Sequence, residues 1–149
     1  AYLVGVALEK ATGEHLAEYL KPRLFEPLDV LEPVYVNCPS GHFYGASGME
    51  LTVEELGRLG GLYLNGGKWN GECILTDEWV KEATSVKTSC REGGYGYFIW
   101  KYKDGFRITG KWGKRCFVFP KTGVVVTYLS DMQERSEDLT EAVMACLEP

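Results

Sequence analysis

The stretch from Gly94 to Ser130 constrains the fold most, because it is dense in aromatic and β-branched residues and is cut by turn signals at regular intervals. Asp104-Gly105, between two strand-like runs, is a strong hairpin signal. Pro120 fixes its own φ and Gly123 can adopt positive φ, so a further turn is favoured between them. The sequence therefore predicts an antiparallel meander, with strands expected at Tyr95–Tyr102, Phe106–Thr109, Lys114–Phe119 and Val124–Leu129.

The segments before the meander are expected to be helical or looped. Apolar residues recur at helical spacing from Tyr2 to Leu8, and Gly13 predicts the end of that helix. A second short helix is expected at Glu14–Leu24, kinked or restarted at Pro22. Asp29–Gly48 has many breakers and predicts a long loop, with a short strand at Val34–Val36.

Three further helices carry start signals. Thr52 and Glu55 form a capping-box pattern, and Thr76 is placed to cap the next helix. Glycines inside a helix cost about 1 kcal/mol each, so Gly60-Gly61 predicts close packing against another element. Ser136 is expected to cap a last helix over Glu137–Leu147.

These elements predict an α+β fold in which helices pack on an antiparallel sheet. We expect residues 1–149 to form a single domain or a fragment of one. Residues 1–90 would be its helical and loop region, and residues 91–149 its meander and final helix.

Composition limits the class of protein. No apolar run approaches the roughly 20 residues of a membrane helix, and a net charge of -5 argues against binding to nucleic acid. The five cysteines are scattered and odd in number, which suggests no disulfide framework and favours a reducing, cytoplasmic compartment.

Several sequence segments, taken in order, resemble those of a known family. GASGMELTVEELGRLGGLYLNGGKWNGECILTDEWVKEAT resembles the helical region of the serine β-lactamase and penicillin-binding-protein family. The resemblance is closest to the class C-like branch, which includes esterases and D-amino-acid peptidases. The opening AYLVGVALEKATGEHLAEYLKPRLFEPLDV resembles the helix pair after the family's Tyr-x-Asn motif, and the meander and last helix resemble the family's C-terminal strands and helix.

The resemblance implies chemistry that needs three clusters. Ser-x-x-Lys supplies the nucleophile and an adjacent amine, Tyr-x-Asn assists proton transfer, and a Lys-Thr-Gly-like strand end anchors substrate and gives an oxyanion-hole amide. This sequence contains no Ser-x-x-Lys, and Tyr-x-Asn would be expected just before Ala1. The chain is therefore expected to be the C-terminal half of such an enzyme, without its nucleophile.

The third cluster is carried over by the resemblance onto Ile108-Thr109-Gly110. Thr109 would face the substrate, Gly110 would allow close backbone approach, and the amide of Lys111 would be the second oxyanion donor. Ile108 and Trp112 would contact substrate, although Ile108 departs from the cationic or histidine residue often found there. The alternative is that Thr109-Gly110 is simply a strand end and turn.

Two other matches are interpreted as structural. Lys121-Thr122-Gly123 spells the motif but lies where a hairpin turn is needed, and Tyr63-Leu64-Asn65 spells Tyr-x-Asn at an expected helix end. Cys38 and His42 are spaced like two metal ligands, but a zinc site needs three or four, and no second cluster exists. We therefore expect neither a metal nor a cofactor.

The sequence thus predicts the C-terminal portion of a serine hydrolase acting on an amide or ester, inactive by itself. The substrate of the parent enzyme would be a β-lactam, a D-amino-acid peptide or an ester. The alternative is a non-catalytic module that binds a ligand or partner in the same groove. The uncharged last strand, Val124–Leu129, leads us to expect self-association of the isolated chain.

Overall fold

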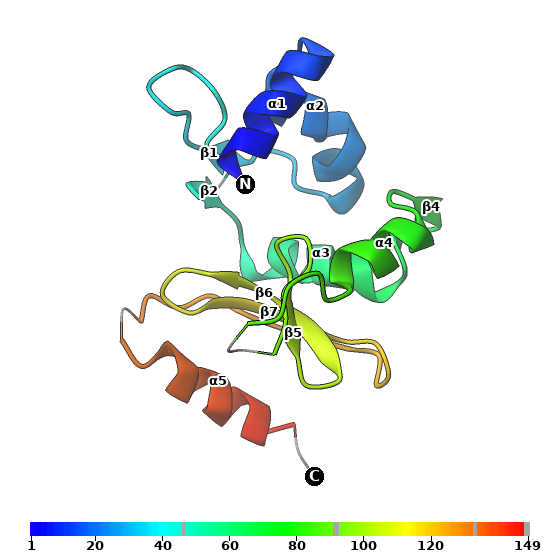
Figure 1. Cartoon of the computed structure of the whole chain (residues 1–149), viewed down its shortest axis with the longest axis vertical. Coiled ribbons are helices and arrows are strands. Elements are labelled where there is room, and N and C mark those ends of the chain that lie inside the picture. Colours follow the sequence, from blue (N-terminus) through cyan, green and yellow to red (C-terminus); the bar gives the residue numbers. More distant parts are fainter. Residues whose placement is uncertain (46, 91–92, 133, 148–149) are drawn as a thin grey trace.

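The computed structural model describes residues 1–45, 47–90, 93–132 and 134–147. A helical part lies at the top of Figure 1, and a sheet with one helix beneath it lies at the bottom. The boundary expected between the helical region (1–90) and the meander region (91–149) cannot be located, because residue 91 lies outside the described residues. The helices are α1 (Tyr2–Thr12), α2 (Leu16–Leu20), the π-helix η1 (Lys21–Phe25), the 3-10 helix η2 (Glu26–Leu28), α3 (Val53–Leu64), α4 (Asp77–Thr84) and α5 (Ser136–Ala145).

The predicted meander is confirmed as a four-stranded antiparallel sheet, in the order β5-β6-β7-β8. Its strands are β5 (Trp100–Tyr102), β6 (Gly105–Gly110), β7 (Lys114–Phe119) and β8 (Val124–Tyr128). The first strand is shorter than expected because Phe98 adopts positive φ and Tyr97 donates its amide to Ala83. Two small pairs complete the sheets: β1 (Val34–Tyr35) with β2 (Met49–Glu50), and β3 (Lys68–Trp69) with β4 (Glu72–Cys73).

Most expected helix starts and ends are confirmed. Gly13 ends α1 in the left-handed conformation, and the helix that was expected to change at Pro22 passes into η1. Thr52 and Glu55 form the capping box of α3, and Thr76 accepts a hydrogen bond from the amide of Trp79 at the start of α4.

The expected cap of the last helix is wrong. Arg135, in the left-handed conformation, is the N-cap of α5, and Ser136 is its first residue. The hydroxyl of Ser136 accepts a hydrogen bond from Arg115 on β7 and caps no α5 amide. The helix ends at Ala145, two residues before the expected Leu147.

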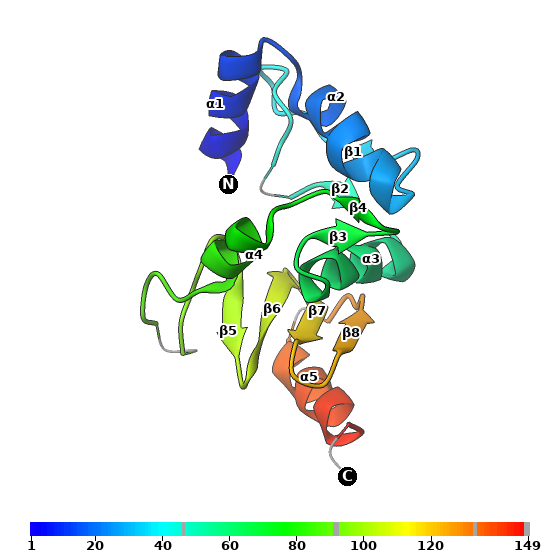
Figure 2. The ribbon, with the colours of Figure 1, turned by 90° about the vertical axis from the view of Figure 1, so that its right-hand side faces the viewer.

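Helix α3 lies between the sheet and the helical part, and Figure 2 shows it packed across one face of the sheet. On the sheet side it joins a cluster built on Ile99, Phe106, Cys116 and Val118. On the other side, the fully buried Leu62 packs with Phe25, Leu28 and Val30 of the helical part. One helix therefore contributes to two apolar clusters.

Close packing at Gly60-Gly61, expected from the sequence, is confirmed. A Cβ placed on Gly60 would lie 2.5 Å from Cys116 Sγ and 2.7 Å from Val125 Cγ1. A Cβ on Gly61 would lie 2.7 Å from the ring of Trp69. Glycine is therefore required where α3 crosses β7 and β8.

Helix α5 covers the opposite face of the sheet. The hydroxyl of Tyr128 lies 2.7 Å from that of Thr140, and both Thr140 and Met144 are buried. Two strand arginines, Arg107 and Arg115, also bind Glu137 on this helix. The lower part is consequently three layers, with α3, the sheet and α5 in that order.

A buried carboxylate connects the elements of the helical part. Oε1 of Glu9 accepts hydrogen bonds from the amides of Leu16 and Phe43, and Oε2 accepts one from the ring of His42. The ring of His15 lies 3.8 Å from the same carboxylate. The amide of Leu16 does most to lower the pKa of Glu9; burial raises the pKa, but the donors of His42 and Phe43 lower it further.

Replacing Gly60 with Ala should destabilise the fold by roughly 1–3 kcal/mol, because the added methyl overlaps Cys116 and Val125. Gly57→Ala is the matched control in the same helix, since its Cβ would meet only Thr127 Oγ1, at 3.6 Å. That change should be neutral or stabilise by up to about 1 kcal/mol. Urea unfolding measures both; equal stabilities would contradict the close approach.

Glu9→Gln should destabilise by roughly 1–3 kcal/mol at pH 7, because the buried donors lose a charged acceptor. Since the folded pKa of Glu9 is lowered, its carboxylate stabilises above the ordinary pKa, and the contribution is lost as pH falls through the lowered value. The difference in free energy of unfolding between the two chains should therefore shrink below about pH 4.5. Glu18→Gln is the control, because Glu18 is exposed. If its difference in free energy of unfolding from the wild type shrank with falling pH as much as that of Glu9→Gln, the prediction would be wrong.

Candidate functional site

The five residues of the sequence-predicted site lie consecutively at the end of β6 and in the turn that follows. Ile108 and Thr109 are half-buried, whereas Gly110, Lys111 and Trp112 are exposed. Ile108 pairs with Cys116 and packs against the apolar cluster on the α3 face. Thr109 pairs with Arg115 and so lies on the opposite face, because successive residues of a strand alternate.

The turn after Gly110 is tightly held. Trp112 and Gly113 both have positive φ, and a Cβ on Gly113 would lie 2.2 Å from Ser130 Oγ. The hydroxyl of Ser130 donates to the carbonyls of Trp112 and Gly113, and the amide of Met132 also donates to Trp112. The segment after β8 therefore fixes the turn between β6 and β7.

Two ammonium groups flank the ring of Trp112. Lys111 Nζ lies 5.1 Å and Lys114 Nζ 5.2 Å from the ring centroid, within the range of cation–π attraction. Lys114 is also 3.6 Å from a carboxylate oxygen of Asp131. The exposed turn consequently carries positive charge beside an aromatic surface.

Two buried arginines and the exposed Glu137 form an ionic group on the α5 side of the same strand end. Arg115 Nη1 donates to the Gly110 carbonyl at 2.8 Å, and Nη2 donates to Glu137 Oε1 at 2.9 Å. Arg107 Nη1 donates to the other oxygen of Glu137 at 3.2 Å. Burial raises the pKa of Glu137, but the bonds from Arg115 and Arg107 outweigh it and hold that pKa below its usual value.

The edge of β6 next to β5 is open at the site. In the described ranges, β5 pairs with β6 only at Gly105, Phe106 and Arg107. Ile108–Gly110 therefore has a partner strand on the β7 side alone. Such an edge presents backbone donors and acceptors to an added segment.

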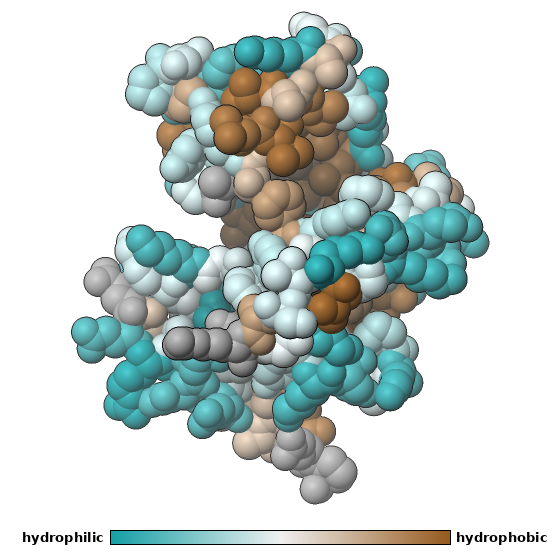
Figure 3. Space-filling model, viewed as in Figure 1, coloured by the Kyte–Doolittle hydropathy of each residue, from teal (hydrophilic) through white to brown (hydrophobic). Residues whose placement is uncertain are grey.

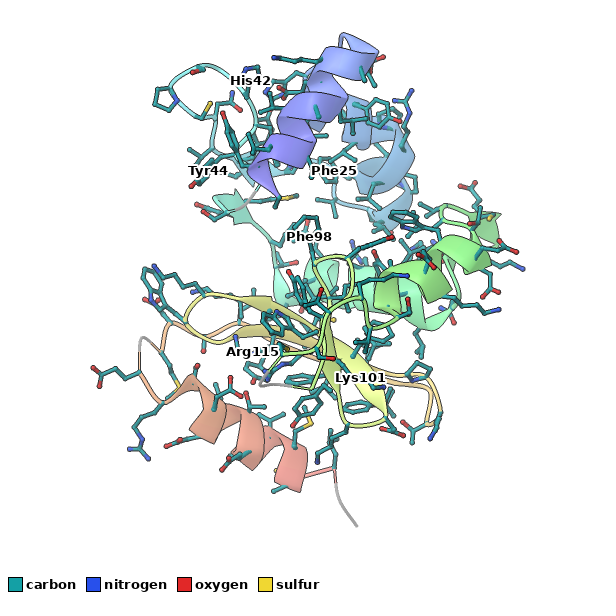
Figure 4. All side chains as sticks on the ribbon, viewed as in Figure 1. Phe25, His42, Tyr44, Phe98, Lys101 and Arg115 are labelled. Atoms are coloured by element: carbon teal, nitrogen blue, oxygen red, sulfur yellow. The ribbon has the colours of Figure 1, made fainter. Side chains whose placement is uncertain are left out.

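Phe98 lies in the loop before β5 and points toward the helical part (Figure 4). Its side chain is 53% exposed, and its φ of 61° is unusual for an aromatic residue. Figure 3 shows the surface recessed between the helical part and the sheet. An exposed aromatic residue held in an uncommon conformation there is a candidate wall for a bound molecule.

A cavity lies elsewhere, between the sheet and the end of α5. It has a volume of about 270 Å³ and is lined by Lys103, Phe119, Thr122, Val124, Met144 and Leu147. None of the five site residues lines it.

The two look-alike motifs have the structural roles expected of them. Lys121-Thr122-Gly123 is the β7–β8 turn, where the amides of Thr122 and Gly123 donate to Phe119. Asn65 is the C-cap of α3, and Tyr63 packs against the sheet cluster. Neither offers a free strand edge.

Cys38 and His42 are joined by a backbone hydrogen bond, and His42 binds Glu9. Among the residues that the structure describes, no group of three or more His, Cys, Asp or Glu side chains could hold a metal ion. No described helix is long and apolar enough to cross a membrane.

Sequence reasoning missed Phe98, Arg107, Arg115 and Glu137. Glu137 is exposed in the first turn of α5, but the structure also pairs it with two buried arginines. The available signal was the two arginines themselves, which stand in strands otherwise dominated by apolar residues. Phe98 carries no comparable signal, because its positive φ depends on contacts made by its neighbours.

Comparison with solved structures finds the same fold in hydrolases and penicillin-binding-protein homologues. A protein from Bacillus anthracis described as a 6-aminohexanoate-dimer hydrolase has 21% identity and a TM-score of 0.79, over 95% of this chain and 40% of that protein. A penicillin-binding protein homologue from Caulobacter crescentus has 19% identity and a TM-score of 0.69, over 97% and 56%. A β-lactamase from Mycobacterium bovis has 18% identity and a TM-score of 0.62, over 95% and 60%.

The chain thus spans 40%, 56% and 60% of these three proteins, less than two thirds of each. A search of curated proteins found no match. The model of the β-lactamase family matches residues 1–146, nearly the whole sequence. With the α+β architecture described above, this match shows that the chain belongs to the β-lactamase family.

Proposed function

We propose that this chain forms the substrate-facing strand end and part of the oxyanion hole of a serine hydrolase that acts on an amide or ester. The nucleophile would come from a Ser-x-x-Lys segment outside this sequence, and residues 1–149 alone would be inactive. The substrate would be a β-lactam, a D-amino-acid peptide or an ester. The observation that carries the proposal is the open edge of β6 at Ile108–Gly110, ending in a fixed turn.

Each site residue has a role in this proposal. A substrate amide adds along the open edge, as a peptide adds to a sheet. Gly110 allows close approach, because it carries no side chain there. Thr109 contacts the substrate from the strand, and Trp112 forms a wall beside it. Ile108 is half-buried against the α3 side, and its exposed part also contacts the substrate.

The chemistry is covalent catalysis through an acylated serine. As the serine hydroxyl attacks the substrate carbonyl, its proton passes to the adjacent amine of Ser-x-x-Lys. The tetrahedral oxyanion that results accepts a hydrogen bond from the amide of Lys111. Backbone donors fixed before the reaction stabilise this charge without reorganising. The bonds that Ser130 makes to the turn support such fixation.

A non-catalytic module is the second candidate. In that case the same open edge would bind a ligand or partner without turnover. In either case residues 1–149 would behave as one unit, because α3 contributes to both the sheet cluster and the helical cluster.

The function is tested in a full-length form that joins this chain to a Ser-x-x-Lys half. Gly110→Val should reduce turnover of a chromogenic cephalosporin or a nitrophenyl ester by about 10²–10³-fold, the cost of one oxyanion-hole donor. A Cβ at this position already lies 2.9 Å from Lys114 Cβ, so a branched side chain displaces the strand end.

Lys121→Ala is the control, since Lys121 lies in an exposed turn, and turnover should stay unchanged. The 149-residue chain alone should show no turnover and no labelling by a fluorescent penicillin. Turnover by the clean isolated chain would refute the hydrolase proposal. A full-length form that is inactive but binds ligand at this edge would favour the non-catalytic module.

Self-association is a further part of the proposal. Strand β8 pairs only with β7 within the described part, and its sequence, VVVTY, has no charge or proline to protect the edge. In the helical part, Leu3 and Val4 of α1 are 76% and 61% exposed, and Figure 3 shows a hydrophobic patch over this helix. Both surfaces favour burial against a second copy.

The isolated chain should therefore sediment as a two-fold dimer at micromolar concentration, with β8 strands or α1 helices in contact. Val126→Lys, in the middle of β8, should shift sedimentation equilibrium toward monomer if the strands meet. Leu3→Lys should do so if the helices meet. A wild-type chain that is monomeric throughout the concentration range would contradict self-association.

A further inference from the structure

Arg115 is the buried residue that connects the proposed site to α5. It extends from β7 toward that helix in Figure 4, and only 6% of its surface is exposed. Its guanidinium donates through Nη1 to the carbonyls of Gly110 and Lys114, and through Nη2 to Ser136 and Glu137. Five planar donors in a rigid fork suit such a bridge, whereas an ammonium could not reach both sides at once.

The bond to Gly110 determines where the next amide points. The carbonyl of Gly110 and the N–H of Lys111 belong to one planar trans peptide group, so they point in opposite directions. Nη1 holds the Gly110 oxygen at 2.8 Å on the side of Arg115. The N–H of Lys111 must consequently point away from Arg115.

The same bond strengthens the amide as a donor. A hydrogen bond from a charged group is shorter and stronger than one between neutral groups. Hydrogen bonds on the two ends of a peptide group polarise each other, by about 10–30% per bond. Arg115 therefore acts on both the direction and the strength of the Lys111 donor.

We propose that Arg115 is a positioning residue, which fixes the Gly110–Lys111 peptide so that the Lys111 N–H is presented to the oxyanion. This inference rests on the proposed function for its catalytic meaning. Its structural content, that Arg115 orients the peptide, can be tested without any reaction. Ser136 and Glu137 act through Arg115 in turn, since they hold its second nitrogen.

Arg107 offers a matched comparison. It is also 6% exposed and donates to the same carboxylate, at the other oxygen. Removing either arginine leaves Glu137 with one arginine fewer. Among the bonds that the structure describes, the one to the Gly110 carbonyl comes from Arg115, whereas the described bond of Arg107 goes to Glu137.

The experiment compares Arg115→Met with Arg107→Met in the 149-residue chain by NMR with ¹⁵N and ¹³C labels. In Arg115→Met, the carbonyl carbon of Gly110 should shift upfield, as expected on loss of a hydrogen bond. The Lys111 amide should move with it and its order parameter should fall toward 0.6, from about 0.85 for rigid backbone. In Arg107→Met, the two chemical shifts and the Lys111 order parameter should remain at wild-type values.

Unchanged signals in Arg115→Met would overturn the inference. Equal changes in both variants would overturn it as well, because the effect would then come from loosened packing of α5. If either variant does not fold, a measurement on the wild-type chain still tests the inference. A through-hydrogen-bond coupling between the Gly110 carbonyl carbon and an Arg115 Nη supports the inference, and its absence refutes it.

Kinetics of the full-length form separate this inference from the proposed function. Arg115→Met should lower kcat about 10–100-fold, part of the loss seen when a whole donor is removed, with KM nearly unchanged, because the oxyanion exists only in the transition state. Arg107→Met keeps the bond to Gly110 and should therefore lower kcat less than Arg115→Met does. Altered NMR signals with an unchanged kcat would keep Arg115 as the residue that orients the peptide but reject Lys111 as the oxyanion donor.

Discussion

The closeness of α3 to the sheet at Gly60 is the constraint on which the rest of the structure depends. Because no side chain separates the helix from Cys116 and Val125, Cys116 and Val118 are completely buried beneath it. The opposite side of the helix remains available to the helical part, where Leu62 is equally buried. A larger residue at Gly60 would separate the layers, and would change the position of the helical part relative to the end of β6.

The two faces of the sheet are held by different kinds of interaction. The α3 face is apolar, whereas the α5 face depends on Arg107, Arg115 and Glu137. In these ion pairs the arginines are buried and Glu137 is 57% exposed. Their net contribution to stability is small, because the desolvation of the arginines offsets much of the attraction. These bonds instead fix orientation, since the guanidinium of Arg115 donates to the Gly110 carbonyl and to Glu137 at the same time. The charged face thus sets the geometry of the strand end, and the apolar face supplies most of the stability.

Local signals in the sequence predicted local structure well. The meander, the capping box at Thr52 and the close approach at Gly60 follow from turn chemistry, capping and helix propensity. The start of β5 was misplaced because the positive φ of Phe98 depends on the amide of Tyr97 reaching Ala83, which lies in another element. The cap of α5 was assigned to Ser136 for the same reason, since the partner of its hydroxyl is Arg115 on β7. Contacts of this kind join residues far apart in the chain, so a short sequence pattern cannot predict them.

The candidate site shows the same division. The turn from Gly110 to Gly113 could be located from glycine spacing, but its bonds to Ser130 and Arg115 could not. Ile108 faces the apolar cluster, where a cation would lose its hydration without a paired charge. The positive charge at this end of β6 accordingly lies beyond the strand, on Lys111 and Lys114 beside the ring of Trp112. There the ammonium groups remain hydrated, and an aromatic face holds them near the open strand edge without the cost of burial.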